Sequence, residues 1–172
     1  MAAIISACQS GDLPASVDVV ITPKEDIGAV ETARSLGVPV AIVPPEVEDY
    51  AATLLAALKG CEVVCLAGYL RLLPQEVLRA FPSRILNVHP ALLPKFGGKG
   101  MYGMRVHEAV LAAGETESGA TIHLVDGQYD EGDILLQRRC PVLPDDTPET
   151  LAARVLVEEH KAYVEAIRRI VA

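Results

Sequence analysis

The sequence has no long apolar segment: its longest stretches without a charged residue are eleven residues, at 1–11 and 35–45. A membrane-spanning helix needs about 20 apolar residues, so none is expected. The first stretch has no basic residues before its apolar part, which argues against a signal peptide, and we expect a cytoplasmic protein. Basic residues are also few, because 15 Lys and Arg face 23 Asp and Glu and give a net charge of −8. This balance disfavours a general nucleic-acid-binding surface.

Residues with the spacing of metal ligands are missing as well. The 4 cysteines form no Cys-x-x-Cys pair, and none of the 4 histidines has a partner at zinc-ligand spacing. We therefore expect no metal site. Cys8, Cys61, Cys65 and Cys140 are expected to be small buried hydrophobic residues.

The chain does contain enough apolar residues for a core, since 51% of its 172 residues are hydrophobic. Short β-branched segments alternate with longer helical patterns, which is typical of βαβ units and predicts an α/β fold. Several strands are continuously apolar, which suits a parallel sheet buried on both faces. The expected strands are 17–21, 38–43, 63–67, 85–89, 121–125 and 134–142, and the expected helices are 2–8, 27–36, 47–58, 75–80, 106–113 and a last one with Thr147 as N-cap and Pro148 as first residue.

The helix at 2–8 has no strand before it. In a doubly wound sheet the first helix follows a strand through a loop that often binds phosphate. We therefore expect a single domain over 1–172 that is incomplete at its N-terminus and lacks its first strand.

The densest chemical signal is the segment Asn87-Val-His-Pro-Ala-Leu-Leu-Pro-Lys-Phe-Gly-Gly-Lys-Gly100. Asn87 and His89 are two residues apart on a predicted strand, so their side chains share one face. They lie at its carboxyl end, where ligands bind in open α/β sheets. An amide and an imidazole aimed at one point can stabilise an oxyanion and move a proton. The alternative is that both side chains only satisfy buried backbone groups.

A second signal is an acidic turn after the strand at 121–125. It holds Asp126, Asp130, Glu131 and Asp133. Such turns are usually just solvated. Alternatively, one of these carboxylates faces His89, favours its imidazolium form and raises its pKa, and spacing alone does not select which one.

Together these segments resemble the glycinamide ribonucleotide transformylases, folate-dependent formyltransferases of purine synthesis. Asn87-Val-His-Pro-Ala-Leu-Leu-Pro-Lys is similar to one motif of that family, and His123-Leu-Val with Tyr129-Asp-Glu-Gly-Asp-Ile134 is similar to a second, which selects Asp130. The similarity runs from residue 2 to about 167. It implies a Rossmann-like, mostly parallel sheet of the formyltransferase type with helices on both faces. The family begins with a strand and a phosphate-binding Gly-x-Gly-Ser-Asn loop, which have no counterpart here.

The resemblance implies transfer of a formyl group from 10-formyltetrahydrofolate, as co-substrate, to the amine of glycinamide ribonucleotide. It makes Asn87 the oxyanion donor, His89 an imidazolium that stabilises the oxyanion and transfers protons, and Asp130 the partner that keeps His89 protonated. A cis peptide bond is implied at Leu93-Pro94. The implied folate contacts are Leu70, Arg71, Leu72, Leu73, Asp126, Gly127, Gln128 and Tyr129, and the implied substrate contacts are Pro90, Leu156, Val157, Glu158 and Glu159.

Several alternatives stay open. The chain is either this transferase, another 10-formyltetrahydrofolate enzyme such as a hydrolase, or an inactive folate-binding fragment, and it is a monomer or a homodimer. Read without the resemblance, residues 70–73 are core packing and Glu159 lies on a solvated helix face. His107, His123 and His160 are interpreted as structural.

Overall fold

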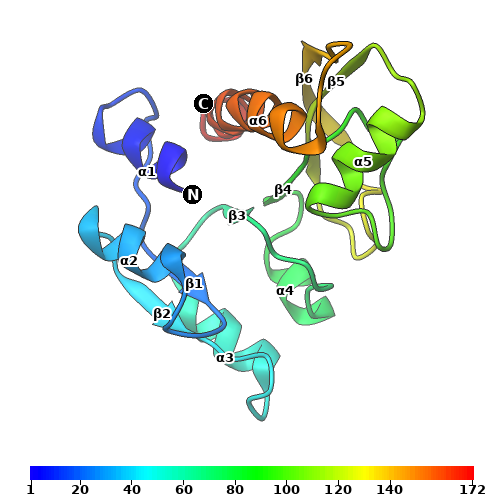
Figure 1. Ribbon diagram of the computed structural model, residues 1–172. Helices are drawn as coiled ribbons and strands as arrows, with labels where there is room; N and C mark the ends of the chain where they lie inside the picture. Colours follow the sequence, from blue (N-terminus) through cyan, green and yellow to red (C-terminus); the bar gives the residue numbers. More distant parts are fainter.

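The computed structural model describes residues 1–172, which form a mixed α/β fold (Figure 1). The helices are α1 (Ala2–Gln9), α2 (Gly28–Ser35), α3 (Tyr50–Ala57), α4 (Gln75–Ala80), α5 (Met104–Ala112) and α6 (Pro148–Val171). The strands are β1 (Val20–Thr22), β2 (Val40–Ile42), β3 (Val64–Leu66), β4 (Ile85–His89), β5 (Glu117–Leu124) and β6 (Ile134–Pro141). None of the helices is both long and apolar enough to cross a membrane.

Hydrogen bonding divides the strands into two sheets. β1 and β2 form a parallel pair, and the other four strands follow the order β3-β4-β5-β6. In the larger sheet β3 and β4 are parallel, whereas β5 and β6 are added antiparallel. β4 is therefore an inner strand, bonded to a parallel neighbour on one side and an antiparallel neighbour on the other.

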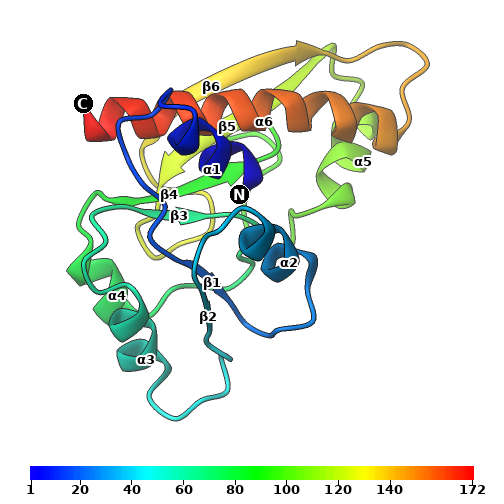
Figure 2. The same ribbon diagram turned by 90° about the vertical axis from the view of Figure 1, so that its left-hand side faces the viewer.

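Helices cover both faces of the strands, so the predicted α/β class is confirmed. In Figure 2, α1 and α6 lie on one side of the larger sheet, and α3 and α4 lie on the other. The apolar contacts agree with this view. Leu86 and Ile122 pack with α1 and α6, whereas Ile85 packs with Leu54 of α3 and Val77 of α4. Consecutive residues of β4 thus face opposite layers, as the pleat of a strand requires.

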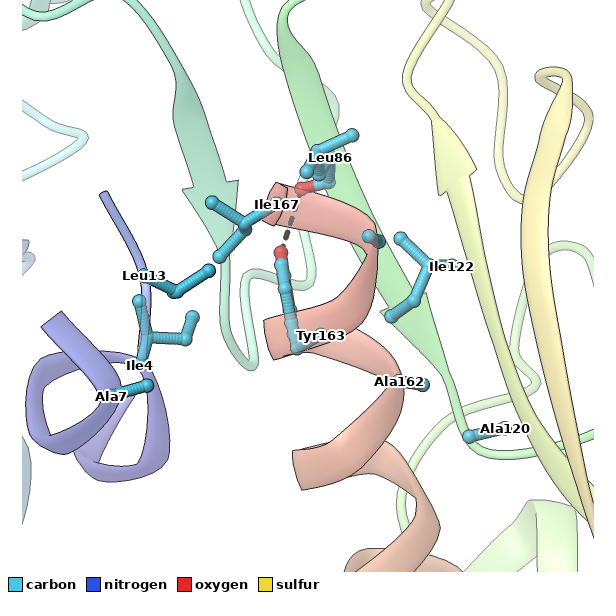
Figure 3. Close-up of a cluster of buried hydrophobic side chains, with 10 residues drawn as sticks. Ile4, Ala7, Leu13, Leu86, Ala120, Ile122, Ala162, Tyr163 and Ile167 are labelled. Atoms are coloured by element: carbon cyan, nitrogen blue, oxygen red, sulfur yellow. Dashed lines mark hydrogen bonds between the residues drawn. The ribbon is translucent and has the colours of Figure 1, made fainter. Parts of the chain in front are cut away.

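The largest buried cluster lies between α1, α6 and the strands β4 and β5 (Figure 3). Tyr163 of α6 is 5% exposed and is its one polar-tipped member. Its hydroxyl lies 2.8 Å from the Leu66 carbonyl and 2.9 Å from the Leu86 carbonyl, so it bonds α6 to the main chain of β3 and β4. A buried tyrosine hydroxyl normally needs such a partner.

Tyr163→Phe is expected to lower the free energy of unfolding by about 1–3 kcal/mol, because the one O–H donor that the two carbonyls share is lost. Urea unfolding of the variant and the parent measures the difference. Tyr102→Phe is the matched control, since Tyr102 is 44% exposed and its hydroxyl makes no bond within the chain. Equal stability of all three proteins would contradict a role for the Tyr163 hydroxyl.

Several elements match the sequence-based prediction, whereas others differ at their ends. The expected strand at 17–21 begins at Val20, and the one at 121–125 begins at Glu117. The elements at 75–80 and 85–89 match, and Thr147 caps α6 by accepting a hydrogen bond from the Thr150 amide. The predicted helix at 47–58 begins later, at Tyr50, because Asp49 accepts from the Ala52 amide and acts as N-cap. The cysteine prediction is only partly correct: Cys140 is buried, but the other three are half-buried.

Candidate functional site

Cross-strand pairing gathers polar side chains on one face of the larger sheet. Asn87 is paired with His123, and His89 is paired with Thr121. Residues directly opposite each other in an antiparallel pair point to the same face. Asn87 and His89 follow Ile85 on the face that α4 covers, so the shared face predicted for these two residues is confirmed. The opposite face, with Leu86 and Ile122, belongs to the apolar core.

Asp130 is brought to this face by a short loop between β5 and β6. The Leu124 amide donates to the Asp133 carbonyl at 2.9 Å, which closes the base of the loop. Gly132 is required there, because a Cβ atom would overlap the Leu124 carbonyl. Asp130 is half-buried, whereas the acidic residues Asp126, Glu131 and Asp133 are exposed. The structure thereby selects Asp130 among the candidates of the acidic turn.

The His89 ring has an acceptor at each nitrogen. Its Nε2–H donates to the Phe96 carbonyl at 2.6 Å, and its Nδ1 lies 3.4 Å from Asp130 Oδ2. The same Oδ2 accepts a hydrogen bond from the Gly98 amide at 3.0 Å. Asp130 and the segment 96–98 therefore enclose the ring, whose residue is only 3% exposed. The cis bond expected at Leu93-Pro94 is present.

His123 belongs to the same cluster, although the sequence analysis gave it a structural role only. Its Nε2 lies 3.1 Å from Asn87 Nδ2 and 3.4 Å from Asp130 Oδ1. Its Nδ1 lies 3.0 Å from the Leu124 carbonyl, which only accepts, so Nδ1 carries a proton and Nε2 accepts from the Asn87 amide in the neutral ring. The signal for this role was available in the motif that contains His123 and Asp130.

Burial sets the electrostatics of the cluster. It lowers the pKa of His89, while Asp130 and the Phe96 carbonyl act in the opposite direction without overcoming it. The expected carboxylate does face His89 and acts to raise its pKa, but burial outweighs this effect, so the net direction differs from the expectation. For Asp130, burial acts to raise the pKa, but the adjacent rings of His123 and His89 and the hydrogen bond from the Gly98 amide together lower it. The cluster thus pairs a carboxylate with a largely neutral His89 near neutral pH.

Acid is expected to destabilise the fold through these histidines. Burial lowers the pKa of His89 and of His107 below the ordinary 6.5, and His89 adds to the effect on His107. The unfolded chain then binds more protons as pH falls through 6.5, so the stability present above that pH is progressively lost. Urea unfolding between about pH 8 and pH 5 measures this, and His107→Gln should flatten the dependence. Equal slopes in both proteins would contradict it.

The residues assigned to folate lie in two neighbouring loops beside α4. Leu70 and Leu72 are 59% and 47% exposed, and Arg71 forms an ion pair with Glu46 at 3.6 Å. Leu73 is buried with Leu54 and Val77, so core packing explains this position without a ligand. The second loop, 126–129, packs on α4, since a Cβ at Gly127 would meet Leu78 and Gln75. Leu70, Leu72 and Tyr129 are therefore large apolar side chains that these two loops leave exposed.

The residues assigned to the amine substrate are divided by their positions on α6. Leu156 and Glu159 line a cavity of about 160 Å³ together with Ala67, Gly68 and Val88. Burial raises the pKa of Glu159, so its interpretation as a solvated side chain is wrong. Val157 and Glu158 do not line this cavity: Val157 is 51% exposed, and Glu158 accepts from Arg138 Nε at 2.8 Å. Pro90 is half-buried directly after β4.

No group of three or more His, Cys, Asp or Glu side chains is arranged to hold a metal ion. The cluster instead offers an amide, two imidazoles and a carboxylate within hydrogen-bonding reach of one another. Such a set can donate to a developing negative charge and can carry a proton from one atom of a reaction to another.

Comparisons with known proteins agree with this chemistry. The family model described as formyl transferase matches residues 1–167. A chloroplastic phosphoribosylglycinamide formyltransferase of Arabidopsis thaliana is 48% identical over 171 residues, which are 95% of this chain and 59% of that protein. The Vigna unguiculata protein of the same name is 49% identical, with 54% of its length covered. The chain therefore spans a little over half the length of these plant relatives.

Bacterial relatives are covered more fully. Phosphoribosylglycinamide formyltransferase of Haemophilus influenzae is 33% identical over 96% of this chain and 78% of that protein. The crystal structure of glycinamide ribonucleotide transformylase 1 from Symbiobacterium toebii has a TM-score of 0.89 at 42% identity, covering 97% of this chain and 79% of that one. Because the family model spans nearly all residues and the fold is shared, this chain belongs to the formyl transferase family.

Proposed function

We propose that this chain transfers a formyl group from 10-formyltetrahydrofolate to the amine of glycinamide ribonucleotide. The observation that carries this proposal is the cluster at the carboxyl end of β4, in which Asp130 lies beside His89 and His123, and His123 contacts Asn87. The names and folds of the relatives, whose matches cover almost the whole chain, support the choice of substrates. No step requires a metal ion.

Asn87 donates to the oxyanion that forms when the amine attacks the formyl carbon. Its amide group has two N–H donors, and His123 Nε2 accepts only one of them. The second is free for the formyl oxygen as negative charge develops on it. A preorganised donor of this kind lowers a barrier by about 3–4 kcal/mol in a site that excludes water. His123 therefore positions the Asn87 amide.

His89 moves the proton that the attack releases. The bond from its Nε2–H to Phe96 leaves the lone pair on Nδ1 in the neutral ring, and a lowered pKa keeps that form populated. Because Nδ1 faces Asp130, the proton of the amine nitrogen reaches it through water as the new carbon–nitrogen bond forms. The imidazolium is then stabilised by Asp130 at 3.4 Å. The proton goes on to N10 of the tetrahydrofolate that leaves as the old carbon–nitrogen bond breaks.

The binding assignments are part of the same proposal. The folate lies against Leu70, Arg71 and Leu72 and takes main-chain contacts from 126–129, with Leu73 supporting that wall from the core. The amine substrate lies near Pro90 and α6, where Leu156 and Glu159 line the cavity and Val157 and Glu158 flank it. The single domain over 1–172, the cytosolic location and the choice between monomer and homodimer remain predictions.

The test measures tetrahydrofolate release from 10-formyltetrahydrofolate by the full chain, with and without glycinamide ribonucleotide. Release that depends on the amine, with formylated amine as product, supports the proposal. Release of formate without the amine would indicate a hydrolase instead. Folate binding without turnover would indicate a binding fragment. A reaction without protein gives the background rate for each mixture.

A further inference from the structure

A buried hydrogen-bond network lies beside the site on the same face of the sheet. Thr121 is paired with His89 on β4 and with Gln137 on β6, so the three side chains form one cross-strand row. The Thr121 hydroxyl donates to the Ala91 carbonyl at 2.6 Å and accepts from the Leu93 amide at 3.0 Å. Gln137 Nε2 donates to the Leu93 carbonyl at 2.9 Å and to Thr121 Oγ1 at 3.0 Å.

The hydrogen-bonding groups of the Thr121 hydroxyl and the Gln137 amide nitrogen are all used. The Thr121 hydroxyl makes one bond as donor and two as acceptor, and both N–H groups of Gln137 Nε2 donate. Thr121 and Ala91 are 0% exposed, and Leu93 is 6% exposed. A buried network that is fully satisfied fixes its members in one arrangement, because any shift leaves a polar group without a partner. The main chain at Ala91 and Leu93 is therefore held to β5 and β6.

Leu93 packs directly against Gly97, in the segment that encloses His89. A Cβ at Gly97 would lie 2.5 Å from Leu93 Cδ2 and 3.4 Å from Asp130 Cβ, so this glycine lies between the two residues. Its neighbours are Phe96, whose carbonyl holds His89 Nε2, and Gly98, whose amide donates to Asp130. The segment that encloses His89 thus rests on a side chain that the network anchors.

We propose that Thr121 and Gln137 are positioning residues that act through Leu93 and Gly97 to place the Phe96 carbonyl and the Gly98 amide against His89 and Asp130. Neither side chain forms a hydrogen bond with His89 or Asp130. As an effect on catalysis, this inference rests on the formyl transfer proposed above. Its effect on His89 is independent of that reaction.

Thr121→Val keeps the shape of the side chain but removes the hydroxyl. It is expected to lower kcat about tenfold with little change in KM, because a displacement of well under 1 Å at a reacting group is already costly. Thr121→Ser restores the hydroxyl and should recover most of the rate. Gln137→Met removes both donors of the amide and should act in the same direction if Thr121→Val does not fold. Thr32→Val is the control, since the Thr32 hydroxyl bonds only to Gly28 on exposed α2.

The pH profile of kcat distinguishes positioning from a general loss of stability. The Phe96 carbonyl acts to raise the pKa of His89 against burial, and the other titratable groups facing this ring are Asp130, His123 and His107. If the carbonyl moves away in Thr121→Val, the acid limb of the profile shifts to lower pH. Loss of stability alone would leave the limb where it is.

Nitrogen-15 NMR titration of the His89 ring gives the same readout without turnover. A lower His89 pKa in Thr121→Val and Gln137→Met, restored in Thr121→Ser, supports the inference. An unchanged titration and an unchanged kcat per folded molecule would overturn it. If the parent protein transfers no formyl group but the titration shifts as expected, the proposed function fails while the positioning role stands.

Discussion

Replacement of His89 by alanine is expected to lower kcat for formyl transfer by roughly 1000-fold, within the range that a general acid–base group contributes. His89 is the proton-transferring group of the cluster, and its Nδ1 lies 3.4 Å from the Asp130 carboxylate that stabilises the imidazolium. Without the ring, the proton of the attacking amine must go to water, and no cation forms beside the oxyanion. Asn87 keeps its own contact with His123, so a residual rate should remain.

The affinity for 10-formyltetrahydrofolate should change little in His89→Ala, because the proposed folate residues lie in the loops beside α4 and His89 itself is 3% exposed. Equilibrium binding of the folate and steady-state kinetics with both substrates separate the two effects. Urea unfolding of the variant shows whether the fold is retained. A parallel loss of folate affinity and kcat, or an unchanged kcat, would contradict the proposed role.

The local elements of the site were predictable from sequence. β4 matches the predicted strand at 85–89, because a β-branched run followed by proline marks both its direction and its end. The shared face of Asn87 and His89 then follows from the period of a strand. α6 begins as predicted because Thr147 and Pro148 are a strong start signal. In each case the information lies within a few residues of the position concerned.

The rest of the cluster depends on the register between strands that are far apart in the sequence but adjacent in the sheet. His123 joins the site because it is paired with Asn87, and Thr121 and Gln137 share a row because they are paired between β5 and β6. No short sequence window contains both members of these pairs. A one-residue shift would turn each of these side chains to the opposite face, and sequence spacing alone does not define that register.

The net direction of the His89 pKa shift could not be predicted, for a related reason. Sequence identifies a nearby carboxylate, which raises the pKa of a histidine, but it does not show how completely the ring is removed from water. In the structure, burial is the largest influence on His89 and outweighs both Asp130 and the Phe96 carbonyl. The depth of burial comes from the loop segment 96–98 closing over the ring, which is a tertiary contact.

Asp130→Asn is expected to lower kcat roughly 100-fold, because the imidazolium formed during the reaction loses its carboxylate partner. Asp130 lies 3.4 Å from both His89 Nδ1 and His123 Nε2, so a neutral amide changes the charge at both rings while keeping the size of the side chain. The matched control is Asp133→Asn in the same loop, whose side chain is exposed and whose structural contact is made by its main-chain carbonyl.

The pH profile of kcat for Asp130→Asn is expected to shift in a defined direction. Asp130 raises the pKa of His89 against the larger effect of burial, so its removal lowers that pKa further. If neutral His89 is the proton acceptor, the acid limb of kcat moves to lower pH even though the plateau is lower. Asp130 also has a lowered pKa, so its stabilising contribution, present above pH 3.8 and lost as pH falls, should disappear from the acid unfolding curve. A kcat profile of Asp130→Asn that superimposes on that of the parent protein would show that Asp130 does not act on His89 in the reaction. If the imidazolium is instead the form in which His89 enters the reaction, activity is lost on the alkaline side of the profile, and that limb moves to lower pH in Asp130→Asn.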